Sequence, residues 1–344
     1  MEIYGNSSTE VVREAITRVR EEGRRTNRWG GTIPAKLGVG APGNRPREMV
    51  EIPYLMVELS DPHKNWTDIG QQTMITFRET EDHLQGDNPG RVILHSKMYR
   101  EWLNADGKLP LTYGERLTSY PVGGGTYIDQ LLKMEERLKE NPSTRKACAA
   151  MWYPDFDQRV ELPACNIFFQ ATVVDGKLDW TTLNRSLDLF HGLTENIFMF
   201  STWQQELATK LGIPVGVYRT ISSNAHFYVD DKPKMDLDMD DPYETIPALF
   251  PEKSVEWVLE DFQTVDKYLD ANEYQKAFET MKQIALKDAY WGKFKAAGVA
   301  DWFILKKDQF MAETAVQFMG VAPWRDNIRR RIKEWKVPSA GMTT

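Results

Sequence analysis

The sequence predicts an α+β fold, with strands and helices in a first body and helices alone after it. The apolar positions 11, 12, 15, 16 and 19 recur with the period of an amphipathic helix. Two apolar runs between residues 166 and 183 flank an Asp-Gly pair, which is typical of two strands joined by a tight turn. Helical patterns dominate residues 254–336. We therefore expect one domain over residues 1–240 and a helical extension over residues 241–344.

Composition describes an ordinary soluble protein. The chain has 344 residues, of which 41% are hydrophobic and 27% charged, so it can bury a sizeable core. Its formal net charge of -7 argues against a dedicated nucleic-acid binder, whose surface should be basic. No targeting segment and no apolar run of membrane-spanning length is evident. We expect a cytoplasmic protein without membrane or nucleic-acid partners.

Cysteine and histidine usage argues against disulfides and metals. The two cysteines, Cys148 and Cys165, imply no disulfide framework and fit a reducing compartment. The five histidines show no spacing typical of metal ligands. We expect no metal site.

The N-terminal third begins with a helix that carries its own boundary signals. Ser7-x-x-Glu10 forms a capping box before the apolar stripe, and Gly23 ends it. Residues 24–31 are basic and Gly-rich, which indicates either a solvated turn or a loop that grips an anion. Residues 38–48 indicate a surface loop, and residues 50–59 a single strand.

Further along, helices and strands alternate. Residues 77–86 predict a helix, residues 113–117 a turn at a strand edge, and residues 128–138 a helix that Asn141-Pro142 stops.

The sequence also predicts the later elements of the first body. We expect a helix from about residue 182, a buried helix over residues 195–211 and a strand over residues 215–226. Residues 230–241 are acidic, which favours a solvated loop over a metal site.

One constellation carries chemistry. Cys165 follows Pro-Ala and leads directly into an apolar strand, so the thiol should lie at a strand end. Arg185-Ser186 offers a grip for phosphate, and Asp188 follows within the same segment. His226 closes the stretch. A thiol, an Arg, an Asp and a His together indicate nucleophilic catalysis on an anionic substrate.

This ordered set resembles the thymidylate synthase superfamily, which includes the hydroxymethylases of dUMP and dCMP. Any one of its motifs is weak, but their order and spacing are specific. The resemblance covers roughly residues 8–230. It is carried by Tyr113-Gly114, Asn141-Pro142, Arg145-Lys146, Pro163, Cys165, Asn166, Gln170, Arg185, Ser186, Asp188, Gly192, Asn196, His226 and Tyr228.

The resemblance implies a fold and a reaction. The fold is a mixed sheet with helices on one face and a second subunit against the other, so a homodimer is implied. The reaction is a one-carbon transfer from 5,10-methylenetetrahydrofolate to a pyrimidine nucleoside monophosphate. Cys165 adds to C6 of the base, C5 takes up the methylene group, and the intermediate is then finished by hydride or by water. Nearby Arg185 should lower the pKa of Cys165, whereas Cys148 resembles an inert packed strand residue.

The resemblance also implies residue roles. It gives catalytic roles to Cys165, Glu79, Asp188 and Asn196; phosphate contacts to Arg28, Arg185 and Ser186 and, from the partner subunit, to the equivalents of Arg145 and Lys146; base and sugar contacts to Gln170, Asn196, His226 and Tyr228; and folate contacts to Tyr99, Trp102, Asp188 and Gly192. Glu79 would serve as general base together with an ordered water. Asn196 both donates and accepts, which matches uracil, whereas an Asp there would suit cytosine.

The sequence departs from the family pattern on the folate side. Residues 80–83 are polar where the family is apolar, so a polar, acidic helix end without a catalytic role is the alternative for the Glu79 segment. Tyr99 replaces a Trp, and Thr194 replaces a Pro. His191 and Glu195 replace apolar residues.

These changes, a missing C-terminal cap and Asn166 after the nucleophile favour water over hydride as the final acceptor. The sequence therefore predicts a dUMP 5-hydroxymethylase, a one-carbon transferase of nucleotide biosynthesis. Thymidylate synthase itself is the first alternative, and a non-catalytic nucleotide-binding protein is the second. Cytosine and ribose nucleotides stay open as substrates.

Overall fold

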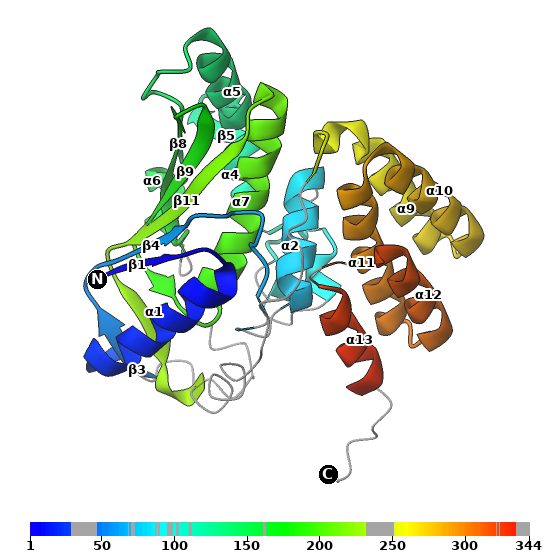
Figure 1. The fold of residues 1–344 in the computed structure, drawn as a ribbon, viewed down its shortest axis with the longest axis horizontal. Coiled ribbons are helices and arrows are strands. Elements are labelled where there is room, and N and C mark those ends of the chain that lie inside the picture. The colour runs from blue at the N-terminus through cyan, green and yellow to red at the C-terminus, as the bar shows by residue number, and fades with distance from the viewer. Residues whose placement is uncertain are drawn as a thin grey trace. The chain divides into compact units, whose positions relative to one another are not determined.

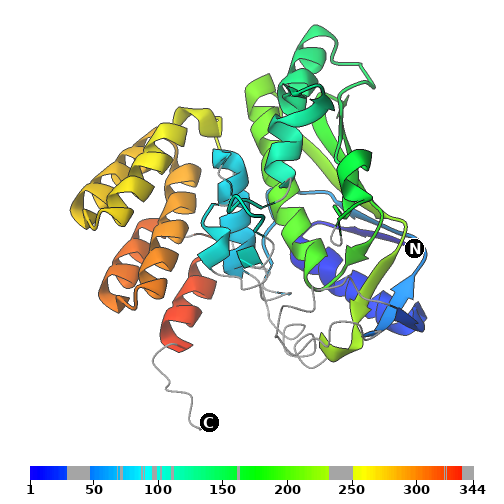
Figure 2. The same ribbon diagram turned by 180° about the vertical axis from the view of Figure 1, so that it is seen from behind.

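The computed structural model divides into two compact units, Met1–Glu244 and Thr245–Thr344 (Figures 1 and 2). It describes residues 1–28, 47–67, 69, 73–86, 88, 90–94, 99–100, 103–109, 112–160, 163–231, 251–320, 322 and 324–334. The first unit contains the sheets, and the described part of the second is helical. The predicted α+β fold with C-terminal helices is confirmed. That residues 1–240 and 241–344 are separate domains stays a prediction.

A mixed six-stranded sheet forms the centre of the first unit. Its strands lie in the order β1-β4-β11-β9-β8-β7. Their bounds are Glu2–Gly5 (β1), Leu55–Leu59 (β4), Val215–Ser222 (β11), Lys177–Asn184 (β9), Asn166–Val174 (β8) and Cys148–Ala150 (β7). β1 runs parallel to β4 and β9 parallel to β11, and the other pairs are antiparallel. The predicted tight turn joins β8 to β9, with Asp175 and Gly176 at φ of 49° and 75°.

Helices cover one face of this sheet, and the main core lies beneath them. Helix α7 (Gly192–Leu211) runs along the sheet, as Figure 1 shows. The rings of Phe169 on β8 and Phe200 on α7 lie 4.5 Å apart between centroids, and Phe169 also packs against Trp180 of β9 at 5.7 Å. All three side chains are fully buried. The buried helix predicted here is therefore confirmed.

The first helix forms as its boundary signals predicted. α1 (Ser8–Glu22) ends at Gly23, and its five predicted apolar positions are fully buried. Ser7 Oγ accepts a hydrogen bond from the amide of Glu10 at 3.2 Å. The Glu10 carboxylate accepts instead from the amide of Asn6 at 2.7 Å, so the second half of the capping box reaches one residue further out.

A second sheet corrects several expectations. Its order is β10-β12-β3-β2, with bounds Leu187–Asp188 (β10), Ala225–Tyr228 (β12), Arg47–Ile52 (β3) and Arg24–Arg28 (β2). Residues 24–28 are thus a strand and not a turn, because they pair with β3 along their full length. The single strand predicted over residues 50–59 is split between β3 and β4 at Pro53, which has no N–H for a continuous ladder. Residues 215–226 likewise divide between β11 and β12.

The helix predicted from residue 182 is wrong. β9 continues to Asn184, and β10 then pairs in parallel with β12. The Asn184 side chain donates to Thr220 Oγ1 and to the carbonyl of Ile221 on β11, at 2.8 and 3.2 Å. These bonds between strands hold the segment in the sheet, which local sequence signals did not reveal.

Short helices and a hairpin make up most of the chain between residue 113 and the nucleophile. α4 (Tyr113–Thr118) replaces the predicted turn, because Thr112 and Glu115 form a complete capping box. A small hairpin follows, made of β5 (Tyr120–Gly123) and β6 (Thr126–Ile128). α5 (Gln130–Glu140) ends at Asn141, as predicted, and α6 is Pro154–Asp157.

The polar run after Glu79 forms the end of a helix and is buried. α2 (Thr73–Gln85) carries Thr80, Glu81, Asp82 and His83, which are between 0% and 5% exposed. The Asp82 carboxylate accepts hydrogen bonds from the amides of residues 91 and 92, next to the short 3₁₀ helix η2 (Val92–Leu94). Buried polar groups need such partners, so this run anchors the segment that follows α2.

The second unit is helical in its described part. Its helices are η4 (Val255–Trp257), α9 (Leu259–Asp270), α10 (Tyr274–Lys287), α11 (Ala289–Leu305), α12 (Gln309–Met319) and α13 (Arg325–Glu334). Aromatic rings of Phe262, Trp291 and Phe294 pack in its core, where Lys295 pairs with Asp266 at 2.7 Å. Within the described ranges of the whole chain, no helix is long and apolar enough to cross a bilayer.

Candidate active site

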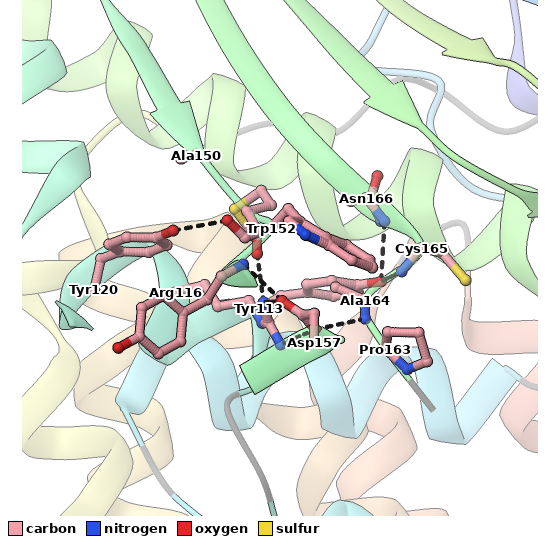
Figure 3. A network of polar contacts seen from close by, with 12 residues as sticks. Tyr113, Arg116, Tyr120, Ala150, Trp152, Asp157, Pro163, Ala164, Cys165 and Asn166 are labelled. Atoms are coloured by element: carbon pink, nitrogen blue, oxygen red, sulfur yellow. Dashed lines mark hydrogen bonds and ion pairs between the residues drawn. The ribbon is translucent and has the colours of Figure 1, made fainter. Parts of the chain in front are cut away.

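Cys165 lies at the entrance to β8, where the sequence predicted it, and its backbone is anchored from two sides. The amides of Cys165 and Asn166 both donate to the hydroxyl of Tyr113, at 3.2 and 3.4 Å (Figure 3). On the other side, the carbonyl of Cys165 accepts from the amide of Arg185 at 2.9 Å. These bonds fix the position from which the thiol projects.

A buried ion pair between Arg116 and Asp157 also holds the segment that leads to Cys165. Arg116 of α4 donates two hydrogen bonds to Asp157, at 2.7 and 2.9 Å (Figure 3). The carboxylate of Asp157 also accepts from the amides of Ala164 and Tyr153, at 3.0 and 2.6 Å. Burial raises the pKa of Asp157, but the hydrogen bonds from Arg116 and the two amides outweigh it, so the pKa is lowered overall. The sequence analysis missed both partners, because neither belongs to a recognisable motif.

Arg185 faces the thiol. Its Nε donates to the carbonyl of Ala164 and its Nη2 to that of Pro163, each at 2.8 Å. Nη2 also lies 3.8 Å from Cys165 Sγ. Arg185 does favour the thiolate, as predicted, but burial of Cys165 is the larger effect, and Asp188 adds to it. The pKa of Cys165 is therefore raised, and the expected net lowering is wrong.

Glu79 has the properties of a general base. Burial raises its pKa to about 7, against a hydrogen bond from Tyr99 that lowers it. A carboxyl that titrates near neutrality is suited to take up and return a proton. The hydroxyl of Tyr113 links the two halves of the site, because the pKa of Tyr113, about 12, is raised first by burial and then by the charges of Cys165 and Glu79.

Asp188 and His226 lie side by side in the second sheet. They are register partners between β10 and β12. Asp188 Oδ1 accepts from the amides of Phe190 and His191, at 2.9 and 3.1 Å, and so orders the turn before Gly192. Burial lowers the pKa of His226, which favours the neutral imidazole.

Asn196 is positioned one turn into α7. Its side chain is 7% exposed, and its backbone carbonyl accepts from the hydroxyl of Tyr218 at 3.4 Å. Its side-chain amide has no hydrogen-bond partner among the residues that the structure describes. An amide held in this way can recognise a ligand with both a donor and an acceptor.

The structure describes some of the remaining predicted residues and not others. Arg145 and Lys146 lie exposed just before β7, and Gln170 Nε2 donates to the carbonyl of Arg145 at 2.9 Å. Arg28 ends β2, but its side chain lies outside the described residues, as does all of Trp102. Cys148, expected to be packed, is instead exposed on the edge strand β7. The roles assigned to the individual site residues stay predictions.

Arg47 is a further cation that the sequence analysis placed in a surface loop. It lies opposite Arg28 on β3, and its guanidinium stacks over the ring of Tyr228 at 3.7 Å. It also pairs with Asp230 and Asp231, at 3.4 and 3.7 Å. The ring of Tyr228 in turn meets His226 edge to face at 5.3 Å. Pairing between β3 and β12 brings these groups together. The residues next to Arg47 in the sequence do not indicate this pairing.

In the described ranges, no three His, Cys, Asp or Glu side chains are grouped as metal ligands would be.

The Asp157 pair gives a stability prediction. Asp157→Asn should cost about 3–5 kcal/mol at pH 7, because it leaves the buried guanidinium of Arg116 without its counter-charge. Since the pKa of Asp157 is lowered by folding, this contribution is present above the unfolded pKa of about 3.9 and is lost as the pH falls. Denaturant titrations at several pH values measure it. Asp155→Asn, in the same helix as Asp157, breaks an exposed pair with Arg159; it is the matched control and should cost under about 1 kcal/mol.

The contact between Arg185 and the thiol gives a second prediction. In a Cys148→Ser background, Arg185→Gln should slow alkylation of Cys165 by iodoacetamide at neutral pH, because the pKa of the thiol rises further without the cation. A rise of one pKa unit would lower the rate about tenfold. Mass spectrometry of the labelled peptide across a pH series measures the shift. An unchanged alkylation profile would show that Arg185 does not tune the thiol.

Comparison with known protein families matches residues 76–285 to the family described as thymidylate synthase. The matched region is more than half of the chain, and it contains Glu79, the Cys165 segment and the base-side residues up to Tyr228. It begins and ends later than the expected span of residues 8–230 and runs into the helical unit. The match supports one-carbon transfer to C5 of a pyrimidine as the general reaction. The chain belongs to the thymidylate synthase family.

Proposed function

We propose that this protein transfers the one-carbon unit of 5,10-methylenetetrahydrofolate to C5 of dUMP and finishes the reaction with water, giving the 5-hydroxymethyl nucleotide. One observation carries the transfer: the backbone amide of the thiol residue, Cys165, is anchored on the Tyr113 hydroxyl at 3.2 Å, and burial raises the pKa of the carboxyl of Glu79 to about 7. A nucleophile and a base so placed can form a covalent adduct and then remove a proton from it.

Cys165 supplies the nucleophile. The sulfur attacks C6 of the base, which makes C5 carbanionic and able to attack the methylene carbon. Burial disfavours the thiolate that this step needs, and Arg185 at 3.8 Å offsets part of that cost. Because backbone carbonyls already hold Arg185, the cation needs no reorganisation when the thiolate forms.

The other groups hold the nucleotide and move its C5 proton. Glu79 takes that proton, directly or through a water. Asn196 presents an amide to the base edge, and His226 and Tyr228 present an imidazole and a phenol to the sugar. Arg185 and Ser186, in the bend between β9 and β10, provide the phosphate contacts of this subunit.

Buried polar atoms near the nucleophile support water as the final acceptor. The side-chain oxygen of Asn166 is buried without a hydrogen-bond partner in the described part of the chain, whereas its side-chain amide lies against the Tyr113 hydroxyl. One carboxyl oxygen of Glu195 is also buried without a hydrogen-bond partner among the described residues. Buried polar atoms of this kind are commonly satisfied by internal waters. A site that retains water favours hydroxymethylation over hydride transfer, which requires water to be excluded.

The product of the reaction tests this proposal. Nucleotides labelled with tritium at C5 (dUMP, dCMP, UMP and CMP) are offered with methylenetetrahydrofolate, and both tritium release and product mass are measured. We expect release from dUMP and a gain of CH2O. Cys165→Ser should abolish release, whereas Cys148→Ser should leave it unchanged, because Cys148 lies exposed on an edge strand.

Other outcomes would point elsewhere. A gain of CH2 together with dihydrofolate would make the protein a thymidylate synthase. Tight nucleotide binding without tritium release from any of the four nucleotides would favour a non-catalytic nucleotide-binding protein.

We also propose that the protein is a homodimer through the sheet face opposite α7. Phe168, Leu183, Ile221 and Met56 are neighbours in register across β8, β9, β11 and β4, so they form one apolar row on that face. All four remain partly exposed. A row of this kind is typical of a buried contact between subunits. It would let the exposed Arg145 and Lys146 contribute to the phosphate site of the other subunit.

Oligomeric state in solution tests the dimer. Leu183→Asp places a charge in the apolar row and should convert the dimer into a monomer, as measured by size-exclusion chromatography with light scattering. Leu132→Asp on the exposed side of α5 is the control and should leave the mass unchanged. A monomeric wild-type protein would contradict the proposal.

A further inference from the structure

Glu195 is a partly buried acid in the first turn of α7 that the reaction described above does not use. Its Oε1 atom is inaccessible to solvent and has no hydrogen-bond partner among the described residues. Burial raises its pKa well above the usual range, and the charges of Glu79 and Asp188 raise it further. A buried carboxyl with a structural role only would normally be hydrogen-bonded, so this one is available to a ligand.

Two acids and a phenol interact electrostatically with Glu195 or with one another. Glu79 comes from α2, Asp188 from β10 and Tyr99 from the segment after η2. Tyr99 is hydrogen-bonded to Glu79, and the charges of Glu79 and Glu195 both raise its pKa, after burial. The groups that shift the pKa of Glu195 are all acidic. Glu79 and Glu195 both have raised carboxyl pKa values, so either of them can carry a proton in this cluster.

The two glutamates separate into a base and an acid. Burial raises the pKa of Glu79 to about 7. Its negative charge then helps to keep Glu195 protonated. Two carboxyls whose environments push their pKa values apart are suited to opposite roles in one reaction.

We propose that Glu195 is a second catalytic acid of this site, which protonates the tetrahydrofolate nitrogen as that nitrogen leaves the transferred carbon, while Glu79 takes the C5 proton. The inference rests on the proposed one-carbon transfer and adds a residue to it. Its basis is the packing of α2 against α7, where the rings of Phe77 and Phe198 lie 5.6 Å apart, two residues from Glu79 and three from Glu195, together with the unpartnered buried oxygen of Glu195.

The proton balance closes without another reagent. When the C5–H bond breaks, Glu79 accepts the proton, and the electron pair forms the double bond from C5 to the methylene carbon. The carbon–nitrogen bond breaks, and Glu195 delivers its proton to the departing nitrogen. Water then adds to the methylene carbon, its proton restores Glu195, and the thiolate of Cys165 leaves C6. Glu79 then releases its proton to solvent, and the second folate nitrogen takes a proton from solvent when the next methylene bridge opens.

Glu195→Gln tests the assignment, because it keeps the size of the side chain and removes the acidic proton. Folate-dependent product formation should fall by about 10²-fold or more, the usual contribution of general acid catalysis. Exchange of the C5 hydrogen with solvent in the presence of nucleotide alone needs only Cys165 and Glu79 and should persist. Glu206→Gln, a change of the same type at a buried position on α7, is the matched control and should preserve both activities.

The pH profile separates an acid from a structural residue. Wild-type product formation should rise as Glu79 ionises near pH 7 and fall at higher pH as Glu195 ionises. In Glu195→Gln the falling limb should disappear and the rising limb should remain. An equal loss of exchange and product formation with an unchanged pH profile would overturn the proposal.

Infrared spectroscopy provides a readout that does not depend on turnover. Burial raises the pKa of Asp82 well above its usual range too, so the readout is the difference between variants. Part of the carbonyl absorption of buried protonated carboxylic acids above pH 7 should be lost in Glu195→Gln and retained in Glu206→Gln. In Glu79→Gln, that part should disappear at a lower pH than in the wild type, because the charge that raises the pKa of Glu195 is gone. Carbonyl absorption in Glu195→Gln equal to that of the wild type would assign the proton to another group and reject the inference.

Failure of the proposed function looks different. If wild-type protein exchanges no C5 hydrogen with any of the four nucleotides, the one-carbon transfer itself is refuted, and the role of Glu195 with it. If exchange and hydroxymethyl product are found but Glu195→Gln matches the wild type, only the role of Glu195 is refuted.

Discussion

The buried pair of Arg116 and Asp157 is the constraint on which the site depends. Taking two charges out of water is costly, and the cost is met only when geometry is good and further hydrogen bonds satisfy both groups. Here the carboxylate accepts two bonds from the guanidinium and two from backbone amides, one of them from Ala164 next to the nucleophile. Together with the Tyr113 hydroxyl, the pair turns an irregular connection into a fixed support for Cys165.

This support determines the chemistry of the thiol. Holding Cys165 at the sheet entrance also buries it, and burial raises the pKa of the thiol more than the facing guanidinium of Arg185 lowers it. The free protein therefore favours the less reactive protonated form. The same burial gives Glu79 a pKa of about 7. Removal from water thus has two effects. It raises the pKa of the Cys165 thiol, which disfavours the reactive thiolate, and it raises the pKa of Glu79 to about 7, which suits a general base.

The polar residues expected on the folate side take two forms in the structure. Residues 80–83 of α2 are buried and partnered, and Asp82, for example, accepts hydrogen bonds from two backbone amides. Glu195 is different, because one of its oxygens has no partner in the described part of the chain. Residues of similar polarity therefore divide into groups that anchor the fold and a group available for chemistry.

The sequence alone determined what local signals encode: the capped helix α1, the hairpin of β8 and β9, the buried helix α7 and the ordered motifs around Cys165 that indicate the family. The tertiary structure decided what depends on partners far apart in the chain. Hydrogen bonds from Asn184 to β11 kept the Arg185 segment out of a helix. Burial reversed the expected pKa shift of Cys165. Neither Arg116 nor Arg47 stood out in the sequence, because a charge acquires its role from the groups that folding brings beside it.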